Sequence, residues 1–359
     1  MNLSLHILSS ERPFLISGPC SVESEAQMNE VAHRLKTHTS TQVIRGGIWK
    51  PRTRPDSFEG VGEKGLKWLK EAGKQVNLKV CTEVSNAKHV EQCLKNEIDV
   101  LWIGARTTVN PFTVQEISDA LKGTKIPILI KNPINPDLKL WMGAVDRFLN
   151  NDLTDITVIH RGFSIYSHHK YRNVPAWEIP IAFKQYFPEI PILCDPSHIS
   201  GNRNLLLELS QKSMDMNFNG LFIETHPNPA EALSDASQQI TPEELKTLIN
   251  SLVLRENKIV SSHQNEMESY RNKIGLLDDR IFELLSSRMK LSEQLAVIKQ
   301  KNNMTILQEK HWKSVFDYRL GKANEYDLSE EFVQKMMEFI HQESIRHQLS
   351  IMNPNIDSE

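Results

Sequence analysis

The sequence predicts an α/β chain in two parts: a (β/α)8 barrel, and after it an all-helical domain of three helices. Three observations lead to this fold class. Eight short β-rich runs alternate with helical stretches over the first ~255 residues. Sixteen of the seventeen prolines lie at or before Pro242, so turn-rich sequence gives way to sequence that can be nearly all helix. From Met267 onward, apolar residues recur with alternating spacings of three and four, as on one face of a long helix.

The β-rich runs are spaced as the strands of βα units are. Eight such units in about 250 residues is the size of a (β/α)8 barrel. An open doubly wound sheet is the alternative, although it usually needs fewer strands. In chain order the runs are Phe14–Ser17, Gln42–Arg45, Lys79–Glu83, Val100–Gly104, Ile128–Lys131, Thr157–His160, Pro191–Cys194 and Gly220–Thr225.

The last part of the chain predicts three helices. The apolar stripe from Met267 to Ile298 predicts a first helix of roughly 35 residues, about 50 Å long. Because a helix of this length cannot bury its apolar face against two shorter ones, we expect a homodimer in which the domain pairs with a second copy. A second helix is expected over about 305–320. Asp327 is expected to cap a third helix that has Glu330 at its N3 position.

These patterns predict a barrel domain over residues 1–255, a polar linker over 256–264 and a helical domain over 265–359. No apolar run approaches the ~18 residues of a membrane span. A net charge of −3 argues against nucleic-acid binding by bulk electrostatics. The four cysteines are far apart and form no CxxC pair, so neither a disulfide framework nor a zinc finger is predicted. We therefore expect a cytoplasmic protein that binds neither membranes nor nucleic acids.

Charged or reactive residues end or follow every predicted strand. A single basic residue after a strand is usually part of a solvated loop, but four of the five strands from the second to the sixth deliver Arg or Lys. In a barrel these positions meet at the C-terminal mouth, where active sites lie. The residues are Cys20, Arg45, Lys50, Arg52, Glu83, Arg106, Lys131, Arg161, His198 and Glu224.

Two kinds of chemistry are expected at this mouth. The thiol of Cys20, the imidazole of His198 and the carboxylates of Glu224 and Asp235 suit a divalent transition-metal ion. From composition alone, the structural interpretation is favoured, in which Cys20 is a small buried apolar side chain and His198 a structural turn residue. The cation-rich stretch 45–55 is stiffened by prolines and loosened by glycines, so it can cradle phosphate, although a charge run is more often a solvated surface.

The first 250 residues resemble the metal-dependent 3-deoxy-D-arabino-heptulosonate-7-phosphate (DAHP) synthases of the compact, type Iβ-like group. Five motifs in order and spacing carry the resemblance: Gly18-Pro19-Cys20-Ser21, Lys50-Pro51-Arg52-Thr53, Ile103-Gly104-Ala105-Arg106, Asp195-Pro196-Ser197-His198 and Ala232-Leu233-Ser234-Asp235-Ala236. The resemblance implies a divalent metal, Mn²⁺ before Fe²⁺, Co²⁺ or Zn²⁺, bound by Cys20, His198, Glu224 and Asp235. It implies that phosphoenolpyruvate is bound by Arg45, Lys50, Arg106, Lys131 and Arg161. It also implies that the phosphate of erythrose 4-phosphate is bound by Arg52 and Thr53.

The competing family is that of the 3-deoxy-D-manno-octulosonate-8-phosphate synthases, the same barrel acting on a five-carbon sugar phosphate. That family carries an Ala-Asn-Arg-Ser-like stretch where this chain has Lys50-Pro51-Arg52-Thr53, and several members replace the metal-binding Cys by Asn. Both positions favour the four-carbon sugar here. Glu83 is our candidate to orient the water that adds to phosphoenolpyruvate; the alternative is a salt bridge to a neighbouring cation.

In the tail, Arg288 occupies a stripe position between Leu284 and Leu291, where an arginine is costly unless it is paired. It is either a register-setting polar residue of a coiled coil or part of a dianion pocket in a helical dimer. Residues 265–350 resemble the all-helical class of chorismate mutases. This resemblance implies that chorismate or prephenate is bound by Arg271 of the partner subunit together with Arg288, Lys299, Gln308, Ser344 and Gln348.

The tail departs from that family on its second helix. The family commonly has an acidic residue followed three positions later by Arg-Glu, where this chain has Gln308, His311 and Trp312. We predict a bifunctional enzyme that makes DAHP, the first step of the shikimate pathway, and converts chorismate to prephenate. We also expect prephenate to inhibit the barrel. The alternative is a tail that binds chorismate or prephenate as a regulatory and dimerising module with little turnover.

Overall fold

The computed structural model describes residues 5, 7, 11–50, 58–165, 170–255 and 261–353. The chain divides into two compact units, residues 1–257 and 258–359. Within the described ranges, all strands belong to the first unit, and the second consists of helices. The first helix of the second unit begins at Ser261, inside the stretch predicted as a linker.

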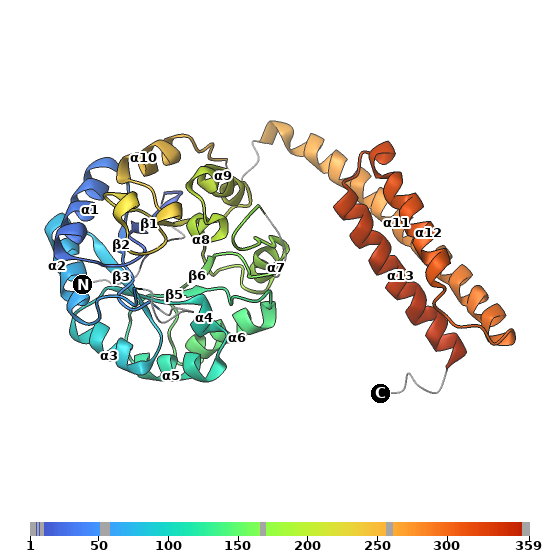
Figure 1. Ribbon diagram of the computed structural model, residues 1–359. Helices are drawn as coiled ribbons and strands as arrows, with labels where there is room; N and C mark the ends of the chain where they lie inside the picture. The colour runs from blue at the N-terminus through green and yellow to red at the C-terminus, as the bar shows by residue number, and fades with distance from the viewer. Residues whose placement is uncertain are drawn as a thin grey trace. The chain divides into compact units, whose positions relative to one another are not determined.

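Eight parallel strands close into a barrel in sequence order, with β1 hydrogen-bonded to both β2 and β8 (Figure 1). This confirms the predicted (β/α)8 class. The strands are β1 (Phe14–Gly18), β2 (Val43–Arg45), β3 (Lys79–Val84), β4 (Val100–Ile103), β5 (Ile128–Lys131), β6 (Ile156–His160), β7 (Ile192–Cys194) and β8 (Gly220–Glu224).

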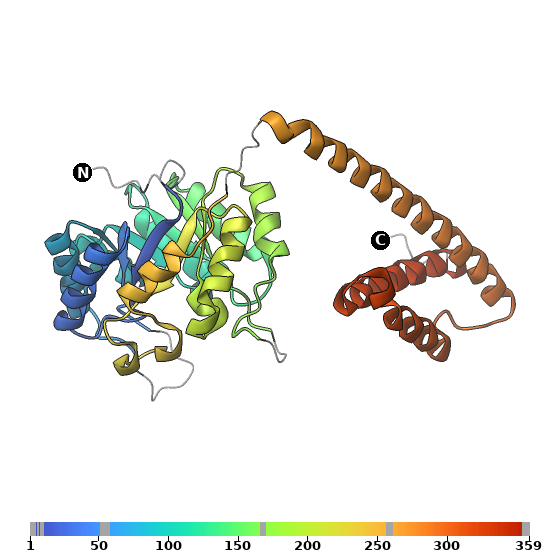
Figure 2. The same ribbon diagram turned by 90° about the horizontal axis from the view of Figure 1, so that it is seen from above.

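Helices surround this ring of strands on its outer side (Figures 1 and 2). Several begin at residues that satisfy the free N–H groups of a first turn. Asn110 accepts hydrogen bonds from the backbone of Phe112 and Thr113, and Thr241 forms a capping box with Glu244. The helices are α1 (Glu25–His38), α2 (Lys64–Val76), α3 (Ala87–Lys95), α4 (Ala105–Thr108), α5 (Pro111–Leu121), α6 (Leu138–Leu149), α7 (Glu178–Tyr186), α8 (Pro196–Ser200), α9 (Leu206–Asp215) and α10 (Pro242–Asn250).

The barrel unit has two apolar layers. Inside the ring, side chains such as Ile16, Trp102 and Phe222 form one buried cluster, so the interior is packed rather than open. A larger cluster joins the outer faces of the strands to the helices. Because strands such as β4 and β5 are buried along their whole length, their sequences are continuously apolar, which is the pattern from which they were predicted.

The second unit is made of α11 (Ser261–Lys301), α12 (Glu309–Gly321) and α13 (Glu330–Met352), with a short 3-10 turn, η5 (Ala323–Tyr326), between the last two. Its small core joins Ala323, Val333 and Met337 to the ring of Trp312. The three predicted helices are thus confirmed. No helix of the described chain is both long and apolar enough to cross a membrane.

Two predicted details of these helices are wrong. The second helix begins at Glu309, four residues later than expected, and the cap of the third is Ser329, whose side chain accepts a hydrogen bond from the backbone of Phe332. Asp327 instead closes the η5 turn in the left-handed conformation, at φ 54°. Aspartate and serine both favour helix N-caps. Because Asp327 is the C-cap of the η5 turn, Ser329 is left to cap the following helix.

The apolar stripe of α11 is largely exposed within one chain. Leu277, Ile281 and Leu284 are 56%, 53% and 70% exposed. Isolated exposed apolar residues are common on protein surfaces, but a contiguous row of them indicates an interaction surface. The row is named here the α11 stripe and comprises Tyr270, Ile274, Leu277, Ile281, Leu284, Leu291, Leu295 and Ile298.

His160, at the end of β6, makes barrel stability depend on pH. Its ring is fully buried near Phe163, Trp177 and Phe218, and burial lowers the pKa of His160 to about 3, with Arg161 adding to the effect. The unfolded chain binds a proton at this residue below about pH 6.5, whereas the folded barrel does not until about pH 3. Stability contributed by the neutral ring is therefore present above pH 6.5 and is lost as the pH falls.

Between pH 4 and pH 6, the free energy of unfolding is expected to rise less steeply with pH when His160 is replaced by leucine. The expected difference in slope is up to about 1.4 kcal/mol per pH unit. Urea unfolding followed by tryptophan fluorescence at several pH values measures this slope. The same change at His33, which is exposed on α1, is the control and should leave the slope unchanged. Equal slopes for the His160 variant and the parent protein would contradict the assignment.

Candidate active sites

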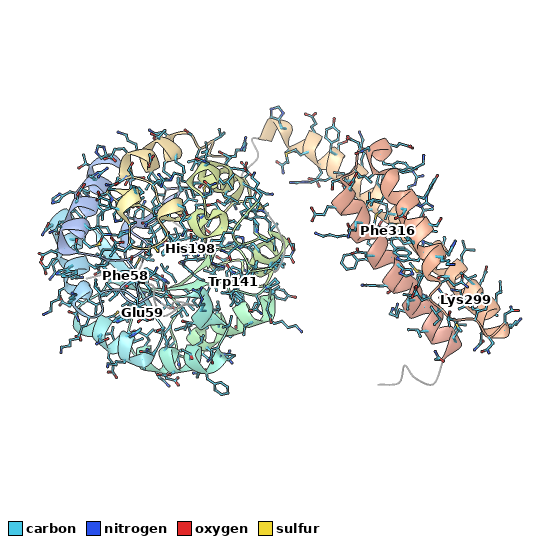
Figure 3. The ribbon with its side chains drawn as sticks, viewed as in Figure 1. Phe58, Glu59, Trp141, His198, Lys299 and Phe316 are labelled. Carbon is cyan, nitrogen blue, oxygen red and sulfur yellow. The ribbon has the colours of Figure 1, made fainter. Side chains whose placement is uncertain are left out.

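The ends of the strands bring the predicted metal donors to one end of the barrel; His198 is the donor labelled in Figure 3. Glu224 ends β8, while Cys20 follows β1 and His198 lies on α8 after β7. The path of β1 depends on Gly18, whose φ is +148° and at which a Cβ would lie 2.1 Å from the carbonyl oxygen of Arg45. Glycine therefore lets the chain pass close to β2 before it turns to Cys20.

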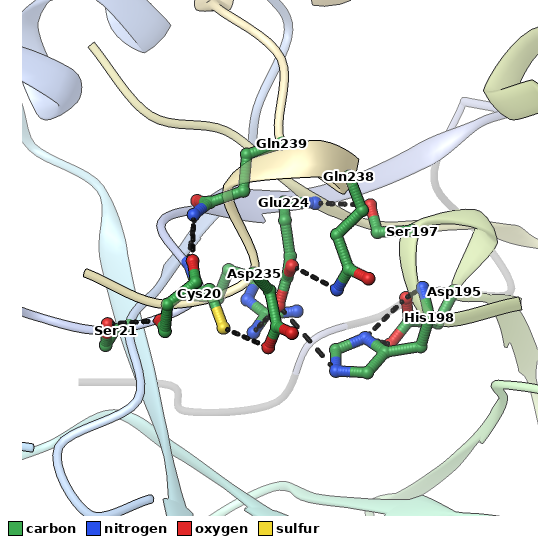
Figure 4. Close-up of polar contacts among 12 residues, drawn as sticks. Cys20, Ser21, Asp195, Ser197, His198, Glu224, Asp235, Gln238 and Gln239 are labelled. Carbon is green, nitrogen blue, oxygen red and sulfur yellow. Dashed lines mark hydrogen bonds and ion pairs between the residues drawn. The ribbon is translucent and has the colours of Figure 1, made fainter. Parts of the chain in front are cut away.

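The four donors face one another as two pairs (Figure 4). Cys20 Sγ lies 3.2 Å from Asp235 Oδ2, and His198 Nε2 lies 3.7 Å from Glu224 Oε1. The other ring nitrogen of His198, Nδ1, lies 2.8 Å from Oδ2 of the buried Asp195. Asp195 thus orients the ring so that Nε2 faces Glu224.

Burial and the carboxylate of Glu224 raise the pKa of the Cys20 thiol to about 12, although the ammonium of Lys50 opposes this. Lys50 Nζ lies 3.0 Å from Cys20 Sγ and 3.0 Å from its carbonyl oxygen. Burial raises the pKa of Asp235, but the charges of His198 and Arg172 outweigh it and lower that pKa overall. Without a further cation, the pair is therefore a neutral thiol beside a carboxylate.

Two cations are buried at the centre of the mouth. Arg45 and Lys131 are 1% and 4% exposed, and both lie against the rings of Trp102 and Phe222. Arg45 Nη2 donates to Glu224 Oε1 at 3.0 Å, and Lys131 Nζ donates to Asp195 Oδ2 at 2.8 Å. Nε and Nη1 of Arg45 are buried without a hydrogen-bond partner among the described residues. Leaving such donors unsatisfied is costly, and a bound anion would satisfy them.

The remaining cations of the predicted anion site lie near this centre. Burial, together with the charges of Arg172 and Arg106, lowers the pKa of Arg161 to about 10, although Asp195 opposes this. Arg106 lies on α4, directly after β4, and its side chain is exposed. Arg52 and Thr53, the predicted sugar-phosphate residues, lie outside the described residues.

Glu83, near the end of β3, is anchored by a tryptophan. Trp102 Nε1 donates to Glu83 Oε2 at 2.9 Å. A Cβ at Gly104 would lie 2.1 Å from Glu83 Oε1, so glycine leaves room for the carboxylate there. The charge of Glu83 acts on both Lys50 and Lys131 and favours their protonated forms.

In the helical unit, one pocket of about 260 Å³ collects five of the six predicted tail residues. Arg288 and Lys299 come from α11, Ser344 and Gln348 from α13, and Gln308 from the start of α12. Arg271 does not line the pocket of its own chain; it is exposed on α11, about 25 Å along the helix from Arg288. The pocket is also lined by Leu291, Ser292, Leu295, Ile306, His311, Trp312, Val315, His341 and Ile345.

The tail pocket is cationic at its polar wall and aromatic elsewhere. Lys299 Nζ donates to the carbonyl oxygen of Ile306 at 2.6 Å and to Gln348 Oε1 at 2.9 Å, and burial lowers the pKa of Lys299. Nη1 of Arg288 is buried and has no hydrogen-bond partner within the described ranges. Trp312 stacks on His341, with ring centroids 3.6 Å apart and planes at 8°. The buried cationic donors and the small volume of the pocket therefore suit a compact anion.

Comparison with known proteins identifies the barrel. Residues 6–259 match the model of the DAHP synthetase I family. The chain belongs to this family. Residues 270–349 match the model for type II chorismate mutase, so the protein is a DAHP synthase domain fused to a C-terminal chorismate mutase domain.

Two relatives from Thermotoga maritima agree with this assignment, and a third relative is a different aldolase. The phospho-2-dehydro-3-deoxyheptonate aldolase of Thermotoga maritima is 33% identical over 238 residues, which are 66% of this chain and 68% of that protein. A crystal structure of the DAHP synthase from the same organism superposes with a TM-score of 0.60 at 30% identity, covering 73% of this chain and 70% of that one. The 2-dehydro-3-deoxyphosphooctonate aldolase of Paracidovorax citrulli is 28% identical over 268 residues, covering 68% of this chain and 90% of that protein.

The DAHP synthase mouth fits a divalent metal in the chemistry of its donors. A thiol, an imidazole and two carboxylates facing one another are the ligands of transition ions such as Mn²⁺, Fe²⁺, Co²⁺ and Zn²⁺. In the part of the chain that the structure describes, no group of three or more His, Cys, Asp or Glu side chains is close enough together to hold a metal ion. The donors stand as two pairs, each within 4 Å, rather than as one closed cage.

Two neighbouring glutamines of the DAHP synthase domain escaped the sequence analysis. Both are fully buried; Gln238 ends the short 3-10 turn η4 (Ala236–Gln238), whose N-cap is Asp235, and Gln239 is its C-cap. Gln238 Nε2 donates to Glu224 Oε2 at 2.7 Å, and Gln239 Oε1 accepts from the backbone N–H of Cys20 at 3.0 Å (Figure 4). They thus fix two of the four donors, and no strand-end rule points to them, because they follow a loop.

Asn173 was also missed. Its side chain accepts from Arg161 Nη1 at 2.8 Å and donates to the carbonyl oxygen of His198 at 2.6 Å. It therefore connects the predicted anion site with a predicted metal donor. In the chorismate mutase domain, the polar pocket residues that the sequence analysis did not name are Ser292 and His341.

Proposed function

We propose that the barrel condenses phosphoenolpyruvate with erythrose 4-phosphate to give DAHP and phosphate. The observation that carries this proposal is the pair of buried cations, Arg45 and Lys131, beside a set of transition-metal donors. Arg45 offers guanidinium donors without protein partners in the described chain, and a phosphorylated carboxylate supplies acceptors for them.

The residues of the mouth divide the chemistry among them. Arg45, Lys50, Arg106, Lys131 and Arg161 hold phosphoenolpyruvate so that its C3 faces the aldehyde carbon, which is a positional contribution to the rate. Cys20, His198, Glu224 and Asp235 would hold a divalent ion, Mn²⁺ before Fe²⁺, Co²⁺ or Zn²⁺, which supplies Lewis-acid polarisation of the aldehyde. Carbon–carbon bond formation leaves positive charge at C2, water adds there, and phosphate departs by C–O cleavage.

Glu83 orients the attacking water in this proposal. Its carboxylate is already fixed by Trp102, so it keeps one oxygen for a further hydrogen bond. Arg52 and Thr53, beyond the described residues, bind the sugar phosphate. The four-carbon sugar is preferred to a five-carbon one because of the Lys50-Pro51-Arg52-Thr53 stretch.

The tail converts chorismate to prephenate without a covalent enzyme intermediate, because the ether C–O bond breaks as a C–C bond forms within the substrate. Arg288, with Arg271 of the partner subunit, meets the two carboxylates, while Lys299 and Gln348 donate to the ether oxygen as its bond breaks. Gln308 and Ser344 complete the binding site. Lys299 and Gln348 support this role, because they are hydrogen-bonded to each other in the pocket wall. The α11 stripe supports a homodimer, since a second copy would cover it.

The enzyme is expected to act in the cytoplasm, with prephenate inhibiting the barrel. Coupling of this kind requires two states of the protein to which prephenate binds unequally. Its support is the fusion itself, which gives a later product of the same pathway a site on the enzyme that begins it.

The decisive experiment measures phosphoenolpyruvate consumption with Mn²⁺ and either erythrose 4-phosphate or arabinose 5-phosphate. We expect turnover with erythrose 4-phosphate to exceed that with arabinose 5-phosphate by at least ~100-fold in kcat/KM, a difference of about 2.7 kcal/mol. A preference for arabinose 5-phosphate would contradict the proposal. Adding prephenate to the same assay tests inhibition, and an unchanged rate would leave the synthase without this regulation.

A further inference from the structure

Four buried polar side chains form a continuous hydrogen-bonded row along one wall of the tail pocket. Lys299 Nζ donates to Gln348 Oε1 at 2.9 Å, and Gln348 Nε2 donates to Ser292 Oγ at 3.1 Å. Ser292 Oγ is in turn hydrogen-bonded to Ser344 Oγ. All four side chains line the pocket and are between 5% and 8% exposed.

The lysine fixes the direction of two hydrogen bonds in this row, its own bond to Gln348 and the bond from Gln348 to Ser292. An ammonium group only donates, so Gln348 must present Oε1 to Lys299 and its NH₂ group to Ser292. Ser292 Oγ accepts that bond, and the bond between Ser292 Oγ and Ser344 Oγ can run in either direction, because a hydroxyl oxygen can accept two hydrogen bonds. Ser344 lines the pocket, and when its hydrogen is donated to a bound anion, Ser292 must be the donor to Ser344 Oγ.

We propose that Ser292 is a positioning residue of the chorismate mutase site, one that fixes the Gln348 amide and makes the Ser344 hydroxyl a donor to the bound dianion. This inference rests on the proposed mutase function. Chorismate presents two carboxylates and an ether oxygen, all of which accept hydrogen bonds. A wall whose free hydrogens point into the pocket stabilises charge on these oxygens without reorganising during the reaction.

Replacing Ser292 by alanine tests the proposal. Alanine can neither accept from Gln348 nor donate to Ser344, so kcat/KM for chorismate should fall about tenfold, with the larger part in kcat. Ser287→Ala is the matched control, because Ser287 is exposed on the same helix and donates only to the carbonyl oxygen of Glu283. Alanine favours a helix interior, so both variants should fold, and unchanged synthase activity of the same chain reports on that.

A double-mutant cycle separates a hydrogen-bonded row from two independent contacts. If Ser292 acts through Ser344, then Ser292→Ala combined with Ser344→Ala should be within twofold of the more severe single variant. Effects that multiply, or a Ser292→Ala variant with the parent kcat, would overturn the proposal.

Failure of the proposed function has a different signature. If the parent protein does not turn over chorismate, the proposed mutase function is wrong. The role of Ser292 is then tested by comparing the affinity for chorismate of the parent protein with that of the Ser292→Ala variant. At least threefold weaker binding by Ser292→Ala would support the ordered row. Equal affinity would overturn it.

Discussion

Replacing Cys20 by alanine is expected to lower kcat/KM of the barrel for phosphoenolpyruvate by ~10³-fold, about 4 kcal/mol, while chorismate turnover by the tail stays within twofold. Alanine removes the sulfur that faces Asp235 and Lys50. Without it, the proposed metal loses its softest ligand and Lys50 loses a hydrogen-bond partner at its ammonium group. Because both activities reside in one chain, the tail reports whether the variant has folded.

The same variant can be tested without an activity assay. The high pKa of the Cys20 thiol, about 12, means that a metal bound by the sulfur must displace a proton at pH 7. Calorimetric titration with Mn²⁺ in two buffers of different ionisation enthalpy counts the protons released, and we expect about one more for the parent than for the alanine variant. Cys93→Ala is the control, since this buried thiol lies on α3 in the outer core. Equal proton release by both proteins would show that Cys20 is not a ligand.

Replacing Lys299 by methionine is expected to lower kcat of the tail for chorismate by ~10³-fold, with synthase activity within twofold. Methionine matches the length of the lysine stem, but it removes the ammonium that donates to Gln348 and to the carbonyl oxygen of Ile306. The ether oxygen then loses its cationic donor, and Gln348 loses the contact that orients its amide.

The loss of chorismate absorbance measures this effect, and Lys290→Met, at an exposed position of the same helix, controls for a general loss of positive charge. A Lys299 variant impaired only in KM would show that the lysine attracts the dianion without acting on the breaking bond. A Lys299 variant with the same kcat and KM as the parent protein would show that Lys299 does not contribute to the chorismate site.

Much of this architecture follows from local sequence patterns. Parallel barrel strands are buried on both faces, so runs such as Val100–Ile103 are continuously apolar and easy to recognise. The barrel topology then brings the residues at and after the end of each strand to one end of the barrel. For this reason Cys20, Lys131 and Glu224 could be assigned to one site from the sequence alone. The stripe of α11 indicated a long helix for the same kind of reason, namely a regular apolar period.

What escaped prediction depends on packing between segments that are distant in sequence. Gln238, Asn173 and Ser292 are ordinary polar residues in the sequence, and they acquire roles only when Glu224, Arg161 or Gln348 is brought beside them. Which of two suitable residues caps a helix was equally undetermined, because the choice between Asp327 and Ser329 depends on the preceding turn.

The bond between Arg45 and Glu224 has a consequence for how ligands enter the barrel. Glu224 Oε1 both accepts from Arg45 Nη2 and faces His198 Nε2. A cation that draws on this oxygen frees the guanidinium to pair with an anion, and an anion on Arg45 frees the carboxylate for a cation. By thermodynamic linkage, each ligand then raises the affinity for the other by the same factor. We therefore expect the mouth of the barrel to bind a cation and an anion cooperatively, so that neither charge is buried alone.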